Sequence, residues 1–456
     1  MRISPNIFRE FSIRGVAEQD LTNDVVFLIG RAIGTFFRQQ DRQRLVVGRD
    51  VRQSSVRISH SLTAGMVQSG IDVIDLGLVP TPVHNFATDF FGADGGAMVT
   101  ASHNPPEDNG LKIRSWETLA GEAIQQIYRI AVSGDFISGE GTVSAKDAYT
   151  PYQAALKRYM ATGRSLKVVV DAGNGANGPL VVELLRQHGH IVVELFIEPD
   201  GAFPNRSPDP TKAGATGALA ALVQSEKADL GLAYDGDGDR LVVVDELGNR
   251  VLGDQILMIL ARDILRNEPA KIVYEILCTQ ALADDVLAHG GEPVMTPSGY
   301  AFVHQAMRDT GAAVGGELSG HLFFNEPEFR FDDAILGTVK LLNILSQSPR
   351  PLSVLVAELP SYHSSPELRV KCPDEAKSRV VEQVKVQFEN DYKVDTLDGA
   401  RIHFKDGWAL VRQSNTQPVI SMRFEARSRE QLDMIQNKVQ SLVEAEISRQ
   451  IRILNL

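Results

Sequence analysis

The chain contains very few cysteines and no long apolar segment. Cys278 and Cys372 are the only two cysteines among 456 residues, and they lie far apart in the sequence. Such a pair indicates neither a disulfide framework nor a zinc site. No uninterrupted apolar run approaches the ~20 residues that a membrane-spanning helix needs, and the N-terminal residues lack the apolar core of a signal peptide. We therefore expect a cytoplasmic protein.

The chain also lacks any concentration of positive charge. Its formal net charge is −12, and no segment gathers lysines or arginines. This distribution argues against nucleic acid or an anionic membrane as the main partner. Any site that binds an anion must therefore be a local pocket on an acidic protein.

What the sequence does contain is a repeated pattern of apolar strand, small-residue loop, amphipathic helix and second strand. The pattern begins at Leu45, Lys167 and Lys271. It predicts three similar α/β domains whose sheets are covered by helices on both faces. From about Tyr362 the sequence changes to alternating strands and two charged helices, near residues 374–390 and 428–447, which predicts a smaller α+β domain.

These observations give a four-domain prediction, in agreement with a length of about three usual domains. Residues 134–150 are expected to form a linker, and residues 346–351 a loop. The predicted domains are residues 1–145, 146–250, 251–360 and 361–456.

One serine is placed for chemistry in the segment Thr-Ala-Ser-His-Asn-Pro-Pro, residues 100–106. It follows a short apolar strand at residues 97–99 and precedes residues 107–110, which are typical of a turn. A hydroxyl on a loop just past a strand end lies where open α/β sheets place reactive groups. Two prolines restrict the loop and favour a fixed orientation of Ser102. An ordinary surface turn has a similar composition, so this loop alone leaves both interpretations open.

A second loop, Asp-Gly-Asp-Gly-Asp-Arg at residues 235–240, predicts a metal site. Carboxylates at alternate positions can converge on one hard cation, and the glycines permit the tight turn. An EF-hand is a poor fit, because Arg240 stands where a glycine is required and residues 241–244 are typical of a buried strand. A Mg²⁺ site in a phosphoryl-transfer enzyme fits better, with Arg240 placed to contact phosphate. A solvated acidic turn is the alternative.

Two further loops carry polar groups suited to a phosphorylated sugar. Residues 315–321, Gly-Gly-Glu-Leu-Ser-Gly-His, offer a carboxylate, a hydroxyl and an imidazole for sugar hydroxyls. Residues 412–418, Arg-Gln-Ser-Asn-Thr-Gln-Pro, offer a guanidinium, hydroxyls, an amide and loop N–H groups for a phosphate, and Arg423 on the next strand offers a second positive charge. His321 is equally compatible with a structural role, and the second loop with a polar hairpin.

Taken together, the four loops resemble those of the α-D-phosphohexomutase family in order and spacing, over essentially the whole chain. Within the family the chain is most similar to the bacterial phosphomannomutase/phosphoglucomutase branch. Residues 7–10 (Ile-Phe-Arg-Glu), residues 13–15 (Ile-Arg-Gly), Asn415 and Leu318 support that assignment. Glucosamine-phosphate mutases typically carry glutamine at the place of Leu318.

The resemblance implies a four-domain enzyme with its site in a central cleft and Ser102 as a phosphoserine. Asp235, Asp237 and Asp239, with the phosphate on Ser102, would bind Mg²⁺, and a hexose 1,6-bisphosphate would be activator and intermediate. The residues implied to contact sugar hydroxyls are Glu317 and Ser319; those implied for the non-transferring phosphate are Arg412, Ser414, Asn415 and Thr416; and those implied near the transferred phosphoryl group are Arg14, Lys112, Arg240 and His321. The partner would be a small phosphosugar, and the protein a monomer or dimer.

The chain departs from the branch at several positions. Leu277 replaces a lysine ahead of Cys278-Thr279, while Pro297 and Tyr300 stand where lysine and histidine are expected. Phe11 and Ser12 replace the usual tyrosine and aspartate, and the loop at residues 114–117 is shorter than usual. Because these changes remove cationic groups near the sugar, they predict altered substrate choice or reduced efficiency with the chemistry retained.

Three functions therefore remain open. The leading hypothesis is a Mg²⁺-dependent mutase that interconverts the 1- and 6-phosphates of glucose or mannose. A specialised relative, such as a glucosamine- or pentose-phosphate mutase or a sugar bisphosphate synthase, is the second. A sugar-phosphate-binding regulator without turnover is the third, although intact Ser102 and three aspartates argue against it. Lys112 and His321 are both candidates for the general base.

Overall fold

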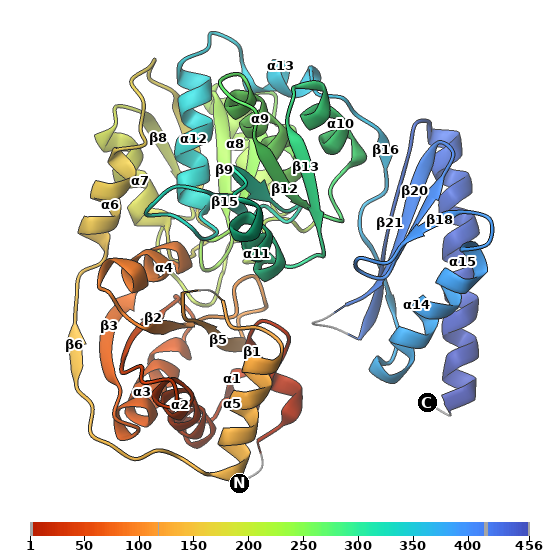
Figure 1. The fold of residues 1–456 in the computed structure, drawn as a ribbon. Coiled ribbons are helices and arrows are strands. Elements are labelled where there is room, and N and C mark those ends of the chain that lie inside the picture. The colour runs from red at the N-terminus through yellow and green to blue at the C-terminus, as the bar shows by residue number, and fades with distance from the viewer. Residues whose placement is uncertain (1–2, 117, 415–417, 455–456) are drawn as a thin grey trace.

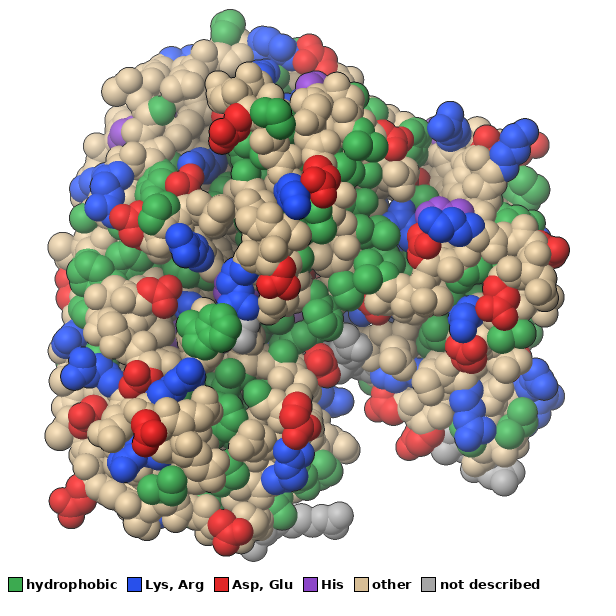
Figure 2. Space-filling view, viewed as in Figure 1, with side chains coloured by type: hydrophobic (Ala, Val, Ile, Leu, Met, Phe, Trp, Pro, Cys, Tyr) green, Lys and Arg blue, Asp and Glu red, His purple; other side chains and the backbone are tan. Residues whose placement is uncertain are grey.

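Four β-sheets, each covered by helices, follow one another along the chain (Figure 1). The computed structural model describes residues 3–116, 118–414 and 418–454. We call the regions around the four sheets lobes I to IV. Lobes I to III form one continuous body, and lobe IV stands beside it, joined through a single extended segment near β16 (His363–Ser364). Figure 2 shows an open notch between lobe IV and lobe I.

Lobe I contains a six-stranded mixed sheet with the order β1-β5-β4-β2-β3-β6. Its strands are β1 (Ile13–Val16), β2 (Arg44–Arg49), β3 (Asp72–Leu78), β4 (Gly95–Val99), β5 (Asp108–Arg114) and β6 (Val143–Ala145), and its helices are η1 (Pro5–Ile7), α1 (Ala17–Asp20), α2 (Asn23–Arg38), α3 (Ser55–Gln68), α4 (Thr81–Phe90) and α5 (Glu122–Ser133). Helices α2 and α3 pack closely because Gly30 and Gly65 face each other's backbone. A Cβ on either glycine would lie within 2.3 Å of a carbonyl oxygen of the other helix.

Lobe II contains a five-stranded sheet with the order β11-β10-β9-β7-β8. Its elements are α6 (Tyr149–Lys157), β7 (Lys167–Asp171), α7 (Gly178–Gln187), β8 (Ile191–Leu195), α8 (Gly217–Glu226), β9 (Leu230–Tyr234), β10 (Leu241–Asp245) and β11 (Arg250–Val251). Strands β9 and β10 are buried along their whole length and run antiparallel, so the loop that joins them lies at the end of these two strands.

Lobe III contains a four-stranded sheet with the order β13-β12-β14-β15. Its elements are α9 (Gly253–Leu265), β12 (Lys271–Glu275), α10 (Gln280–Ala288), β13 (Glu292–Thr296), α11 (Tyr300–Thr310), β14 (Val314–Gly316), β15 (Leu322–Phe324), α12 (Ala334–Ser346) and α13 (Leu352–Ala357). The pairs β2–β3, β7–β8 and β12–β13 are all parallel, with α3, α7 and α10 between their strands. This confirms the predicted threefold recurrence of one α/β unit.

Lobe IV is the smaller α+β region that the sequence predicted. Its sheet is antiparallel throughout and is covered by two helices. Besides β16, its elements are β17 (Leu368–Lys371), α14 (Asp374–Phe388), β18 (Lys393–Asp395), β19 (Ala400–Phe404), β20 (Gly407–Gln413), β21 (Val419–Ala426) and α15 (Arg429–Leu454). Among the described residues, no helix has the length and apolar character needed to cross a membrane.

The clusters of buried apolar side chains show which lobes pack against one another over a shared core. One core cluster runs through lobes I, II and III, from Val46 of β2 to Leu342 of α12. Lobe IV has a separate core of its own. Its apolar contact with lobe III is a small cluster of Ile276, Leu277, Trp408 and Leu410.

Two local predictions were only partly correct. The turn expected at residues 107–110 lies earlier, at Pro106 and Glu107, where the Asp108 N–H donates to the Pro105 carbonyl oxygen, and β5 already begins at Asp108 and pairs with β1. Residues 134–150 are not simply a linker, because β6 pairs in parallel with the edge strand β3 and α6 begins at Tyr149. In both cases an exposed or polar stretch is paired at a sheet position that its own composition does not indicate.

Candidate active site

Ser102 lies at the point where lobes I and II meet. It follows β4 and is 1% exposed. Its Oγ donates to Asp235 Oδ2 at 2.7 Å, and it lies 3.1 Å from His103 Nδ1. The structure therefore brings together the serine loop and the acidic loop, which are 133 residues apart in the sequence.

The acidic loop holds three fully buried carboxylates between β9 and β10. Ligand oxygens of Asp235, Asp237 and Asp239 all lie within 4.8 Å of one another. Asp235 Oδ1 accepts the N–H groups of Asp239 and Arg240, each at 3.1 Å. Asp237 Oδ1 and Asp239 Oδ1 have no hydrogen-bond partner among the described residues, although both are buried. Buried carboxylate oxygens without donors fit a hard divalent cation.

The same geometry rules out the EF-hand alternative. The loop is followed at once by the buried strand β10. Glu246, which would be the last ligand of an EF-hand, instead accepts a hydrogen bond from the backbone N–H of Ser353 at 3.2 Å and another from the Ser353 hydroxyl.

Lys112 supplies the positive charge that faces these carboxylates. Its Nζ lies 2.7 Å from Asp237 Oδ2 and also contacts Asp239 Oδ2. Burial works against the charged forms, but the ion pairs outweigh it, so the pKa of Lys112 is raised and that of Asp237 is lowered. Burial and the neighbouring carboxylates Asp239 and Asp237 raise the pKa of Asp235 well above its usual range. Lys112 is thus a cation in direct contact with this loop, and the guanidinium groups of Arg14 and Arg240 add positive charge nearby.

Three further side chains that the family resemblance implied lie around this centre. Arg14 of β1 donates to Asn104 Oδ1 in the serine loop at 3.1 Å. Arg240 Nε donates to His321 Nε2 at 3.0 Å, and the Nδ1 of the same ring lies 3.0 Å from Asp332 Oδ2. His321 is therefore held from both sides, by a guanidinium and by a carboxylate.

The sugar loop lies between β14 and β15 of lobe III. Ser319 Oγ donates to Glu317 Oε2 at 2.7 Å, while Glu317 Oε1 is buried without a hydrogen-bond partner among the described residues. Beneath the loop, Glu275 Oε1 accepts the N–H of Leu318 at 2.9 Å. Burial, followed by the charge of Glu317, raises the pKa of Glu275 to about 8. Two carboxyl groups thus lie close together where a sugar is expected.

The phosphate loop follows β20 in lobe IV. Arg412, the last residue but one of that strand, is 7% exposed, and its Nε donates to Asp398 Oδ2 at 2.8 Å. The same Asp398 oxygen accepts the N–H of Ser298 in lobe III at 2.9 Å. The carbonyl of Ser414 accepts Lys377 Nζ at 2.6 Å. Asn415 and Thr416 lie outside the described residues.

Arg423 does not add a second charge to this loop, contrary to our expectation. Its guanidinium donates to the carbonyl oxygen of Leu277 and lies 3.8 Å from Asp254 Oδ2. It therefore joins lobe IV to lobe III. Arg412 pairs with Ser421, and Arg423 lies two residues beyond Ser421 on β21. The strand register therefore places Arg412 and Arg423 on the same face of the sheet.

The positions that depart from the family pattern lie at junctions between lobes. Leu277 is 7% exposed and packs against Trp408 and Leu410 of lobe IV. Tyr300 donates its hydroxyl to the Phe11 carbonyl oxygen at 3.1 Å, and its ring stacks on His321 with centroids 5.8 Å apart. Nearby, Arg308 lies over the ring of Trp116, 4.5 Å from its centre. The altered residues therefore connect lobes I, III and IV.

Several residues of the site were missed by sequence reasoning. Arg52 and Asp50 support the serine loop, Thr81 donates to Asp237 Oδ2 at 2.7 Å, and Asp332 faces His321. Asp50 and Arg52 directly follow β2, at the same end of the sheet as Ser102. The strand-end argument that singled out Ser102 applies to them as well.

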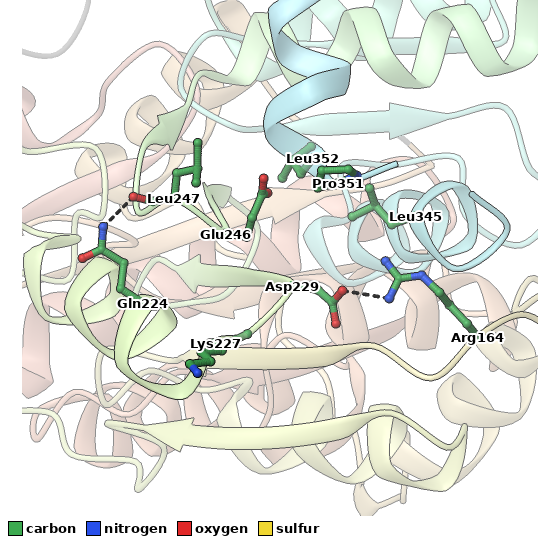
Figure 3. A pocket seen from close by; sticks show the side chains of 10 residues that line it. Arg164, Gln224, Lys227, Asp229, Glu246, Leu247, Leu345, Pro351 and Leu352 are labelled. Carbon is green, nitrogen blue, oxygen red and sulfur yellow. Dashed lines mark hydrogen bonds and ion pairs between the residues drawn. The ribbon is translucent and has the colours of Figure 1, made fainter. Parts of the chain in front are cut away.

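A separate pocket of about 460 Å³ lies away from these loops (Figure 3). It is bordered by lobe II and by the start of α13. Arg164 pairs with Asp229 at 2.8 Å across this pocket (Figure 3), and Glu246 accepts a hydrogen bond from the backbone N–H of Ser353. None of the site residues predicted from the sequence lines it.

Comparison with known proteins shows similarity along nearly the whole chain. Models described as phosphoglucomutase/phosphomannomutase match in four successive parts: alpha/beta/alpha domain I over residues 5–138, domain II over 149–248, domain III over 252–362 and the C-terminal domain over 367–442.

Individual relatives agree with this match. A phosphoglucomutase from Neisseria meningitidis is 39% identical over 450 residues, which cover 97% of this chain and 98% of that protein. A phosphomannomutase/phosphoglucomutase from Pseudomonas aeruginosa is 40% identical over 443 residues, 96% of each chain. The crystal structure of a phosphoglucomutase/phosphomannomutase family protein from Burkholderia thailandensis has a TM-score of 0.91 and 38% identity over 98% of each chain.

Proposed function

The chain belongs to the phosphoglucomutase/phosphomannomutase family of hexose phosphate mutases, and on that premise we propose a Mg²⁺-dependent reaction through a phosphoserine at Ser102. The enzyme interconverts the 1- and 6-phosphates of glucose, mannose or both. The observation that carries this proposal is the 2.7 Å contact between Ser102 Oγ and Asp235 of the three-aspartate loop. A nucleophilic oxygen beside a cluster of cation ligands is the arrangement that phosphoryl transfer requires.

The residues suit a bound Mg²⁺. Asp235, Asp237 and Asp239 would hold it together with a phosphate oxygen on Ser102. Once bound, Mg²⁺ neutralises charge on the phosphoryl group. Lys112, Arg14 and Arg240 lie around the same centre and stabilise the negative oxygens of the group in transfer.

The reaction has two phosphoryl transfers. In the first, the bond between phosphorus and Ser102 Oγ breaks and a bond to a sugar hydroxyl forms, giving a hexose 1,6-bisphosphate. The hydroxyl proton passes to a base, and Ser102 Oγ takes up a proton in turn. After the bisphosphate has turned by half a revolution, its other phosphate returns a phosphoryl group to Ser102.

Lys112 and His321 both remain candidates for the general base. His321 Nδ1 lies 3.0 Å from Asp332 Oδ2, an orienting carboxylate, but its Nε2 accepts a hydrogen bond from Arg240 Nε and must be released before it can take a proton. Lys112 is engaged by two aspartates and is better placed to hold phosphate oxygens. Glu317 and Ser319 would bind the sugar hydroxyls in both orientations of the intermediate, and Arg412 and Ser414, with Asn415 and Thr416, the phosphate that is not being transferred.

The test is a direct assay of the purified chain with Mg²⁺. Glucose 1-phosphate, mannose 1-phosphate and glucosamine 1-phosphate are supplied separately, each with a trace of the matching 1,6-bisphosphate. We expect 6-phosphate from glucose or mannose and little from glucosamine, because Leu318 stands where glucosamine-phosphate mutases carry glutamine. No 6-phosphate from any sugar would overturn the proposal. A location in the cytoplasm and a monomeric or dimeric state remain predictions.

A further inference from the structure

Ser102 has a backbone conformation that needs external support. Its φ angle is +52°, in the left-handed region that residues with a Cβ rarely adopt. The conformation aims Oγ at Asp235, and the loop leaves little room on the other side. A Cβ added at Gly236 would lie 2.6 Å from the Ser102 carbonyl oxygen. Some part of the molecule must therefore hold both backbone groups of Ser102 in place.

A closed ring of four hydrogen bonds provides this support. The Ser102 N–H donates to Thr100 Oγ1 at 2.8 Å, and the Thr100 hydroxyl donates to Asp50 Oδ2 at 2.8 Å. Arg52 Nε donates to the same Asp50 oxygen at 3.1 Å, and Arg52 Nη2 donates to the Ser102 carbonyl oxygen at 2.8 Å. The ring starts at the N–H of Ser102 and ends at its carbonyl.

Arg52 also fixes the rest of the serine loop. Its Nη2 donates to the carbonyl oxygen of Asn104 at 2.7 Å, and its Nη1 donates to those of Pro105 and Asp108 at 2.5 and 2.9 Å. With Asp50, all five side-chain N–H groups of the guanidinium have acceptors. The side chain is 1% exposed, and its Cζ lies 5.2 Å from the ring centre of Phe203 in lobe II.

We propose that Arg52 is a positioning residue for phosphoryl transfer, acting through the backbone of Ser102. This inference rests on the proposed function of Ser102. Because Arg52 is buried behind the loop, it acts without touching the sugar or its phosphates. A planar group with five fixed donors holds four carbonyls in one arrangement, which the single ammonium of lysine does not reproduce. Loss of this arrangement moves Oγ relative to Asp235 and slows transfer.

Arg57 provides a matched control: it lies on α3, the helix that begins three residues after Arg52. It also donates to backbone carbonyls, those of Ala17 at 2.8 Å and Leu21 at 2.7 Å. It pairs with Glu18, and its side chain is 27% exposed. Among the described residues, it has no hydrogen bond to the serine loop. Its replacement therefore measures the effect of losing an arginine that binds backbone carbonyls away from Ser102.

The experiment compares Arg52→Lys with Arg57→Lys in the full chain. Each protein is mixed with glucose 1,6-bisphosphate and Mg²⁺, and the rate of phosphorylation of Ser102 is followed by intact mass and peptide mapping. In Arg52→Lys we expect this rate and kcat to fall about 10²-fold, because a displacement of about 1 Å costs that much. KM for the hexose phosphate is expected to stay near that of the unaltered chain. Arg57→Lys should change neither.

A second variant keeps the test decisive if Arg52→Lys does not fold. Thr100→Val removes one hydroxyl from the ring while leaving the buried charges in place, and it should also lower kcat with little change in KM. A folded variant of either kind that phosphorylates Ser102 at the unaltered rate would overturn the inference, as would a change confined to KM. If the unaltered chain itself takes up no phosphoryl group at Ser102, the proposed function is wrong instead.

Discussion

The two halves of the site are built differently. The serine and acidic loops belong to lobes I and II, which share one continuous core, and their key side chains are held by buried hydrogen bonds. The sugar and phosphate loops belong to lobes III and IV, which have separate cores. These lobes meet through a small apolar cluster, the bridge from Ser298 to Asp398 and Arg412, and hydrogen bonds made by Arg401, Arg423 and Glu425 of lobe IV. We call these the transfer half and the recognition half. The first lies within one continuous core, whereas the second is formed between two cores.

The positions where we expected the chain to depart from the family pattern lie outside the transfer half. Among the described residues, Leu277 and Tyr300 make no hydrogen bond to the serine or acidic loops, although the Tyr300 ring centre lies 5.8 Å from Lys112 Nζ. They lie at the III–IV and I–III junctions. The hydrogen-bond ring of Ser102 and the three aspartates are complete. Substitution at a junction changes how lobes meet, while the transfer half keeps its geometry.

The largest expected effect is a loss of kcat when the metal is removed, because the metal acts in the transfer half and not in the recognition half. Chelation of Mg²⁺, or the substitution Asp237→Asn, should lower kcat by about 10³-fold, because charge on the transferring group loses its main stabilisation. Binding of glucose 1-phosphate to the recognition half should change little. Isothermal titration with and without chelator measures the binding, and a steady-state assay measures kcat. Equal losses of binding and kcat would contradict the separation of the halves.

The converse change is made at Arg412 in the recognition half. Arg412→Met removes a charge-assisted contact to phosphate, so KM should rise by about 10- to 100-fold. Arg369→Met, on β17 of the same lobe, is the control and should behave like the unaltered chain. Steady-state kinetics with each variant checks this. A normal KM in Arg412→Met would show that Arg412 does not contact the phosphate of the substrate.

A smaller effect is expected from placing at position 277 the lysine that the family resemblance implied there. Leu277→Lys loses the burial of a leucine against Trp408 and Leu410, which should lower the stability of the III–IV junction by about 2 kcal/mol. Hydrogen exchange of amides in β20 and β12 measures this directly. Leu277→Met conserves volume and serves as the control. Unchanged exchange in Leu277→Lys would show that the junction does not depend on this contact.

The smallest effect concerns pH. The pKa of Glu275 is raised to about 8 by burial and by Glu317, so the group is neutral below that pH and gains a negative charge above it. A second negative charge beside Glu317 disfavours a phosphorylated sugar, so KM should rise a few-fold as pH increases through 8. In Glu275→Gln this rise should disappear. Measurement of KM on both sides of pH 8 for the two proteins decides the matter, and identical profiles would refute it.

Much of the transfer half could be predicted from the sequence because each loop is continuous. Ser102 and the aspartates at 235, 237 and 239 each lie within a few residues of one another or of a strand end, so local rules apply to them. The position of Arg52 just past a strand end could have marked it as a candidate, but its role could not be predicted in the same way. Its role depends on four carbonyls of a loop some 50 residues away, and only the fold brings them together.

The fold itself was largely predictable, since parallel strands and amphipathic helices leave strong periodic signals. The exceptions are instructive. Strand β6 is exposed and has no apolar pattern, and it is recognisable only from its pairing with β3. The side chain of Arg423 was misplaced because a strand position does not reveal which lobe it faces. In the recognition half, the decisive contacts cross between lobes and carry no local signal.

The most direct test of the account is the fate of Ser102 in the unaltered chain. The protein is incubated with glucose 1,6-bisphosphate and Mg²⁺, digested and mapped by mass spectrometry, and then exposed to glucose 1-phosphate. We predict one phosphoryl group on Ser102, which is lost to the sugar in the second step, and none in Ser102→Ala. A phosphoryl group at another residue, or a Ser102→Ala variant with full mutase activity, would contradict the account.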